Sequence, residues 1–177
     1  MAVRASLLAL LLLAVAAGIC DGWRKRVPNT LTYPAILVGM LVGFLEGGLP
    51  GLGWSALGAS AGLLGTLPLF ALGGMGGGDV KLFAAIGALA GPWGLLFCFV
   101  ASLLIGALFA VALLAWRGEL LRTTGAILLH LATAATPWVK TAPLHAGARL
   151  NLRFGVPIAL GAILFATYRE LGPRLGF

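Results

Sequence analysis

Residues 31–73 read LTYPAILVGMLVGFLEGGLPGLGWSALGASAGLLGTLPLFALG, and this almost wholly apolar stretch decides the fold. As one straight helix it would extend about 65 Å, roughly twice the thickness of the hydrocarbon core of a bilayer. Pro50 and four glycines interrupt it between Glu46 and Gly53, and proline and glycine are strong helix breakers. The stretch therefore predicts a membrane-spanning helical hairpin that turns over residues 46–53.

The stretch from Val80 to Trp116 has the same length problem, and the residues Gly-Pro-Trp-Gly at 91–94 supply the break. It predicts a second hairpin with a short first arm. Residues 5–20 and 154–168 are apolar enough for a first and a last span. We therefore expect one all-α domain over residues 1–177, a polytopic transmembrane helix bundle of about six spans broken by Gly/Pro loops.

Composition agrees with a lipid bilayer as the surroundings of this chain. The 177 residues are 60% hydrophobic and 10% charged, which is far outside the range of soluble domains, and 27 glycines suit close helix packing in lipid. The net charge of +7 comes from Lys and Arg in the loops rather than from one basic face, so no nucleic-acid partner is expected.

The distribution of basic residues predicts the topology. Residues 123–139 are moderately apolar and either cross the membrane or lie along its interface. If they do not cross, six spans leave most of the twelve basic residues on the inner side, as the positive-inside rule requires. A seven-span arrangement with residues 140–153 outside is the alternative. The first twenty residues also resemble a secretory signal, but the basic residues at 24–26 favour a retained helix that ends in the cytoplasm.

The chain has only two aspartates, Asp21 and Asp79, and each stands where an apolar run meets a polar loop. A charged carboxylate at the edge of a membrane span costs free energy, and such residues commonly have a function. Two hairpins return the chain to one face, so both aspartates are expected at the cytoplasmic surface. If they are close, they share a proton, and one can act as base and the other as acid on a water molecule.

Each aspartate also has a simpler interpretation. Asp79 follows five glycines within residues 73–78 and precedes a helix, so it could be a helix N-cap. A cap does not need that many glycines, however, and the missing side chains leave room for an extended peptide. Asp21 could be an interfacial charge neutralised by the basic residues at 24–26.

Several neighbouring residues have structural interpretations. Asn29, after Val27 and Pro28, is expected to cap the second helix. Lys81 is expected to extend to the interface, or alternatively to influence the charge of Asp79.

No metal site is predicted. Cys20 and Cys98 lack metal-ligand spacing and are interpreted as packing residues, and His130 is interpreted as structural. No zinc-protease motif and no Ser, His and acid trio occurs.

Three segments resemble the type IV prepilin peptidases. The run Gly-Gly-Gly-Asp at 76–79, continued by VKLFAAIGA, resembles their second catalytic-aspartate motif, G-x-G-D. Residues 21–34, DGWRKRVPNTLTYP, resemble their first motif. Residues 153–159, RFGVPIA, are similar to their aromatic-Gly-x-x-Ile-Ala segment, with the proline slightly displaced.

The resemblance implies a multi-pass intramembrane aspartyl endopeptidase of the bacterial inner membrane that needs no cofactor. Such enzymes remove the short basic leader of prepilins or pseudopilins at the cytoplasmic face. It implies that Asp21 and Asp79 are catalytic, and it makes five motif positions candidates for substrate binding: Pro28, Asn29, Gly76, Gly78 and Lys81.

The chain resembles the short enzymes that serve Flp/Tad pili. Larger members carry a domain with cysteine pairs between their first two spans and also methylate the new N-terminus. Here only about ten residues separate these spans, so methyltransferase activity is not expected.

Two other functions remain open from the residues alone. A small ion- or proton-coupled transporter would use boundary aspartates to bind or relay ions, although it predicts carboxylates deeper in the spans. A membrane scaffold without activity would use both aspartates as anchors.

Overall fold

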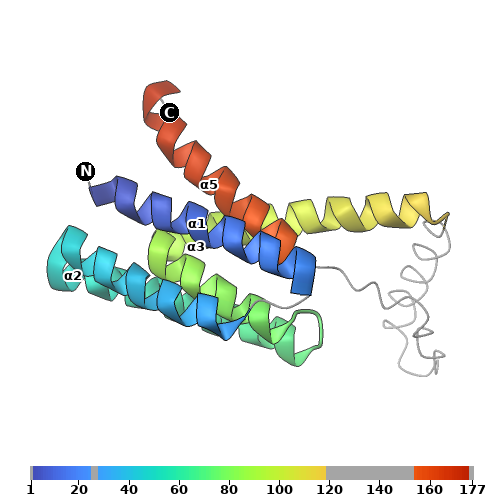
Figure 1. Cartoon of the computed structure of the whole chain (residues 1–177), viewed down its shortest axis with the longest axis horizontal. Helices are drawn as coiled ribbons and strands as arrows, with labels where there is room; N and C mark the ends of the chain where they lie inside the picture. Colours follow the sequence, from blue (N-terminus) through green and yellow to red (C-terminus); the bar gives the residue numbers. More distant parts are fainter. Residues whose placement is uncertain (1, 25–27, 119–153, 176–177) are drawn as a thin grey trace, which may run out of the picture. The chain divides into compact units, whose positions relative to one another are not determined.

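The computed structural model describes residues 2–24, 28–118 and 154–175. Figure 1 shows the helices of this part of the chain. They are α1 (Ala2–Arg24), α2 (Asn29–Ala71), α3 (Gly77–Trp116) and α5 (Gly155–Leu175). Three of them contain stretches long and apolar enough to cross a membrane: Ala5–Trp23, Asn29–Ala71 and Gly77–Trp116. The predicted all-α class and membrane character are confirmed.

The chain divides into two compact units. The first comprises Met1–Ile105 and Arg153–Phe177, and the second comprises Gly106–Leu152. All sites discussed below belong to the first unit. The segment 123–139, on which the choice between six and seven spans depended, lies outside the described residues, as does His130. The expectation of a single domain over the whole chain stays a prediction.

Helix α2 reverses direction at Gly48, whose φ of 60° and ψ of −144° are not helical. Glycine adopts a positive φ without the strain that a side chain causes. Beyond the bend the chain runs back along itself, because the Ser55 hydroxyl donates a hydrogen bond to the Gly39 carbonyl oxygen at 3.3 Å, sixteen positions earlier. The backbones of Gly43 and Gly51 are also in contact. The hairpin predicted with a turn over residues 46–53 is confirmed.

Helix α3 bends in the same way at Gly91, which has a φ of 71° and is followed by Pro92. The rings of Phe83 and Phe99, from opposite sides of this bend, pack edge to face with centroids 5.4 Å apart. The second predicted hairpin is therefore also present.

The predicted count of about six spans differs from what the structure shows. The described part of the chain has four helices, of which three are long and apolar enough to cross. The difference arises because α2 and α3 are each counted as one helix, although the non-helical residues Gly48 and Gly91 divide each of them into two helical arms.

Close backbone contacts hold α2 against α3. Gly58 packs on Gly87, and Gly62 packs on the backbone of Phe83, at distances that leave no space for a Cβ atom. Small residues allow such contacts, which maximise van der Waals packing between helices in lipid. Helix α1 packs against α2 and α5, and Figure 1 shows α1 and α5 side by side.

The core of the first unit is formed by side chains from α1, α3 and α5. Leu10, Phe83, Ile86 and Ile158 are almost fully inaccessible to solvent. Cys98 is a free thiol buried in the same cluster, as expected of a packing residue, and Cys20 is a half-buried free thiol. This core holds the ends of the helices on which the candidate site is built.

Gly58→Val tests the close contact between α2 and α3. The added side chain would overlap the Gly87 carbonyl group, and overpacking of this kind costs about 1–3 kcal/mol of unfolding free energy. Denaturant unfolding in detergent micelles, followed by the helical circular dichroism signal, measures the loss. Gly65→Val is the matched control, because a Cβ at Gly65 meets no atom within 4 Å. Equal stability of the two variants would contradict this packing.

Candidate active site

Asp21 lies in the last turn of α1 and is only 6% exposed. Its Oδ2 atom is buried and has no hydrogen-bond partner among the described residues. Gly155, the first residue of α5, packs directly on it: a Cβ added at Gly155 would lie 2.6 Å from the Asp21 Cγ. Asp21, at the end of α1, is therefore enclosed by the start of α5. The interpretation that the basic residues at 24–26 neutralise its charge depends on side chains outside the described residues.

Asp79 lies in the first turn of α3 and is half-buried. Its Oδ2 accepts a hydrogen bond from the backbone N–H of Gly76 at 3.3 Å. Gly76 immediately precedes α3. Asp79, three residues later, binds the backbone N–H of Gly76, as the acidic residue of a capping box binds that of the N-cap residue. The expectation that Asp79 could be the N-cap residue is wrong, because α3 already begins at Gly77.

The two aspartates come together although they are far apart in the sequence. Helix α1 ends and α3 begins at the same end of the first unit, and the carboxyl groups of Asp21 and Asp79 are close enough for their charges to interact. The reversal of α2 is what brings them together, because it returns the chain to the end from which it started. The two carboxyl groups differ in exposure, because Asp21 is buried and Asp79 is half-buried.

Part of the glycine run before Asp79 has a structural purpose that the sequence did not reveal. Gly73 has a φ of 74° and donates its N–H to Phe70, and Gly74 donates its N–H to Leu69, both at 2.9 Å. This is a Schellman motif, which ends α2. The interpretation that the run leaves room for a peptide therefore stays a prediction, and it concerns only the glycines after residue 74.

The remaining glycines lie around the Asp79 carboxyl group. A Cβ at Gly76 would lie 3.2 Å from Asp79 Oδ2, so even an alanine would crowd it. Gly76 and Gly77 are exposed, and Gly78 is half-buried in the first turn of α3. The backbone next to Asp79 is thus accessible to another chain.

Lys81 connects the beginnings of α2 and α3. Its Nζ donates a hydrogen bond to the side-chain oxygen of Asn29 at 2.8 Å and lies 5.3 Å from the centroid of the Tyr33 ring. The expectation that Asn29 caps α2 is wrong: Pro28 occupies the N-cap position, no side chain caps the helix, and the Asn29 amide binds Lys81 instead. The sequence analysis did not select Tyr33, although its place one turn after Asn29 puts it on the same helix face.

Gly155 is the other residue of the site that the sequence analysis did not nominate. The available signal was its place in the segment at 153–159, but nothing in the sequence pairs that segment with Asp21. No three His, Cys, Asp or Glu side chains gather as metal ligands in the described ranges.

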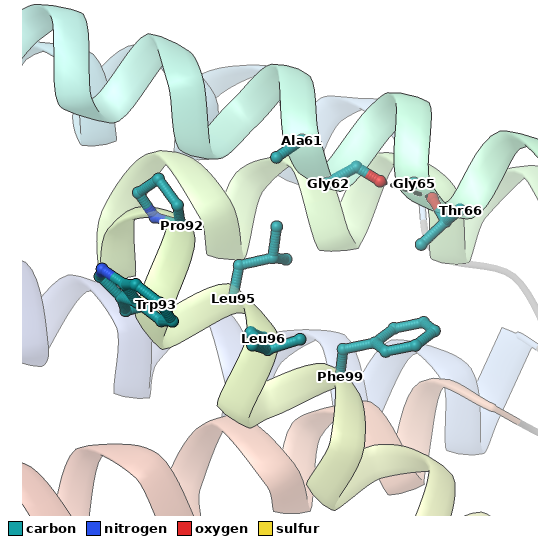
Figure 2. A pocket seen from close by; sticks show the side chains of 9 residues that line it. All are labelled: Ala61, Gly62, Gly65, Thr66, Pro92, Trp93, Leu95, Leu96 and Phe99. Atoms are coloured by element: carbon teal, nitrogen blue, oxygen red, sulfur yellow. Dashed lines mark hydrogen bonds between the residues drawn. The ribbon is translucent and has the colours of Figure 1, made fainter.

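An apolar groove of about 420 Å³ lies between α2 and α3, away from the aspartates. Figure 2 shows Pro92 and Trp93 at one end of it and Thr66 and Phe99 at the other. None of the residues that line it is ionisable. The groove can contact apolar chains but offers no group for proton transfer.

Comparison with known proteins now identifies the family. Residues 7–111 match the model of the type IV leader peptidase family, which is more than half of the chain. The chain belongs to this family. The match includes both aspartates, all of α2 and α3 as far as residue 111, and it confirms the family resemblance seen in the two aspartate motifs; α5 lies outside it.

The curated relatives are named prepilin leader peptidase/N-methyltransferase. The protein of Aeromonas salmonicida (strain A449) is 36% identical over 112 residues, which is 59% of this chain and 38% of the relative. That of Bacillus subtilis (strain 168) is 36% identical over 105 residues, 56% of this chain and 41% of the relative. The protein of Aeromonas hydrophila is 31% identical over 173 residues, which is 76% of this chain and 59% of the relative. The matches thus cover between about two fifths and three fifths of these relatives, and no solved structure matches significantly.

Replacing Lys81 and Asn29 tests the link between α2 and α3. Lys81→Met and Asn29→Ala should each lower the unfolding free energy, and the double variant should lose less than the sum, by about 0.5–1.5 kcal/mol, the net contribution of one hydrogen bond. Denaturant unfolding in micelles measures the four proteins of this cycle. Lys81→Arg keeps a donor and serves as the control. Strict additivity would show that the two side chains do not interact.

Proposed function

We propose that this protein is a prepilin leader peptidase in which Asp21 and Asp79 hydrolyse the peptide bond. The observation that carries the proposal is the interaction of two carboxyl groups from distant segments, one of which has a buried oxygen, Asp21 Oδ2, with no hydrogen-bond partner among the described residues. A buried and unpartnered carboxyl group is costly, and such groups cluster at functional sites. The membership of a peptidase family supports the same chemistry.

The mechanism follows from the proximity of the two groups. Two adjacent carboxyl groups do not both ionise readily, so the pair holds one proton. The carboxylate removes a proton from a water molecule, the water oxygen attacks the scissile carbonyl carbon, and the protonated carboxyl group donates its proton to the carbonyl oxygen. The tetrahedral intermediate, which carries two hydroxyl groups, then collapses: the C–N bond breaks, the leaving amine takes up the proton that the base had accepted, and the other carboxylate takes back a proton from one hydroxyl as the product carboxylic acid forms. No covalent intermediate and no cofactor is required.

The substrate in this proposal is a prepilin or pseudopilin, as the names of the relatives suggest. A basic leader stays in the cytoplasm while the apolar helix after it enters the bilayer beside the enzyme. The scissile bond then lies at the depth of the helix ends that carry Asp21 and Asp79. Gly76 and Gly78 would admit the extended backbone of the substrate, and Pro28 stands immediately before α2.

The proposed topology lets both arms of each bent helix cross the membrane. The first arm of α2, from Asn29 to the bend at Gly48, is about 28 Å long, close to the thickness of the hydrocarbon core. With α1 and α5 this makes six crossings in the bacterial inner membrane. The basic residues between α1 and α2 favour a cytoplasmic position for the aspartates.

The proposal concerns the peptidase activity. The relatives are named for two activities, but the chain matches only part of their length. Helix α1 ends at Arg24 and α2 begins at Asn29, so no domain is inserted between them. That the chain does not methylate its product, and that it serves a pilus of the Flp/Tad type, remain predictions.

A transporter is the less favoured function. Ion-coupled transport uses ionisable groups within the spans, near the middle of the bilayer. In the described helices the two aspartates lie at helix ends, and the family is one of peptidases.

Asn substitutions test the catalytic pair. Asp21→Asn and Asp79→Asn should each lower the cleavage rate of a peptide with a basic leader, a glycine and an apolar helix by at least about 10²-fold, because each removes one proton-transfer group. Purified protein in detergent and mass spectrometry of the products measure the rate. Glu46→Gln, which neutralises an exposed acid at the bend of α2, should cleave at the unmodified rate. An Asn variant that cleaves as fast as the control would show that the pair is not catalytic.

A further inference from the structure

Gly155 is in closer contact with a candidate catalytic residue than its type alone suggests. A Cβ added there would lie 2.6 Å from the Asp21 Cγ, 2.7 Å from its Cβ and 2.8 Å from its Oδ2. Real Cβ atoms do not approach other atoms this closely. The Asp21 carboxyl group therefore rests on the backbone at the start of α5.

Rotation of the Asp21 side chain would not relieve this overlap. The Cβ atom of Asp21 is fixed by the backbone of α1, and it is itself one of the atoms in the overlap. Any side chain at residue 155 would have to push the end of α1 away from α5. The position of the carboxyl group is thus coupled to the absence of a side chain at this one residue.

Packing against other helices prevents α5 from moving to relieve the overlap. Ile158 and Ala162 are fully buried, and Gly161 packs on Ser102 of α3 so closely that a Cβ there would lie 2.7 Å from the Ser102 hydroxyl oxygen. One turn and a half after Gly155, α5 is therefore anchored to a second helix. A side chain added at residue 155 would therefore displace Asp21 and the end of α1 rather than α5.

The surroundings of Asp21 are also typical of a carboxyl group that takes part in a reaction rather than one that only stabilises the fold. Its Oδ2 is buried and has no hydrogen-bond partner in the described part of the chain, although it lies next to the first turn of α5, where backbone N–H groups lack intrahelical acceptors and carry partial positive charge. A carboxyl group placed only for stability would be expected to use such donors. Asp21 instead presents an unpaired oxygen in a tightly enclosed position.

We propose that Gly155 is a positioning residue that holds the Asp21 carboxyl group within reach of Asp79. The inference rests on the proposed function, and it adds α5 to the active site although this helix lies outside the matched family region. A displacement of about 1 Å at a catalytic group can cost about 100-fold in rate.

Two glycines on the same helix allow a matched test. Gly155→Ala should lower kcat about 100-fold and leave KM nearly unchanged, because it displaces a reacting group without changing substrate contacts. Gly161→Ala introduces a comparable but slightly smaller overlap, with Ser102 and Cys98, away from the aspartates. It should lower the unfolding temperature while the folded protein keeps its kcat. An unchanged kcat in Gly155→Ala, or an equal loss in both variants, would overturn the inference.

A second measurement does not depend on catalysis. If the overlap is with Asp21, the loss of thermal stability caused by Gly155→Ala should largely disappear in an Asp21→Gly background, because the colliding atoms are gone. An undiminished loss of stability in that background, or failure of the double variant to fold, would overturn the contact. This cycle fails or succeeds independently of the Asn substitutions, which test the proposed function itself.

Discussion

A helix as long as α2 cannot cross a bilayer once, and its reversal at Gly48 is the constraint on which the rest of the first unit depends. Because the chain folds back, α3 begins at the end where α1 finished. Two carboxyl groups that are remote in the sequence can then meet at one boundary. Without the reversal, Asp79 would stand at the opposite end of the helices from Asp21.

Glycine has three different uses in this arrangement. At Gly48 and Gly91 it permits a backbone conformation that reverses a helix. At Gly58 and Gly87 it allows two helices to touch through their backbones. At Gly155 it leaves room for the carboxyl group of another helix. The first two uses build the bundle, and we propose that the third positions a reacting group.

Much of the hairpin architecture could be predicted from the sequence, because the length limit of a bilayer and the helix-breaking residues both act locally. The proximity of Asp21 and Asp79 could be predicted in the same way, because a hairpin between them returns the chain to the same side of the membrane. The residue at which each hairpin turns was harder, since Gly48 and Gly91 are each one of several helix-breaking residues at their turn. The partner of Asn29 and the contact between Gly155 and Asp21 could not be predicted, because they depend on how helices far apart in the sequence pack.

The most direct test of the account is the proximity of the two aspartates in the membrane. Cysteines replace Asp21 and Asp79 in a chain in which Cys20 and Cys98 are replaced by serine and alanine, and a short bifunctional thiol reagent is applied to membranes. The account predicts an intramolecular cross-link between positions 21 and 79. It predicts none between positions 21 and 46, because Glu46 lies about 25 Å along α2 from its first residue. A cross-link from 21 to 46 but not to 79 would contradict the account.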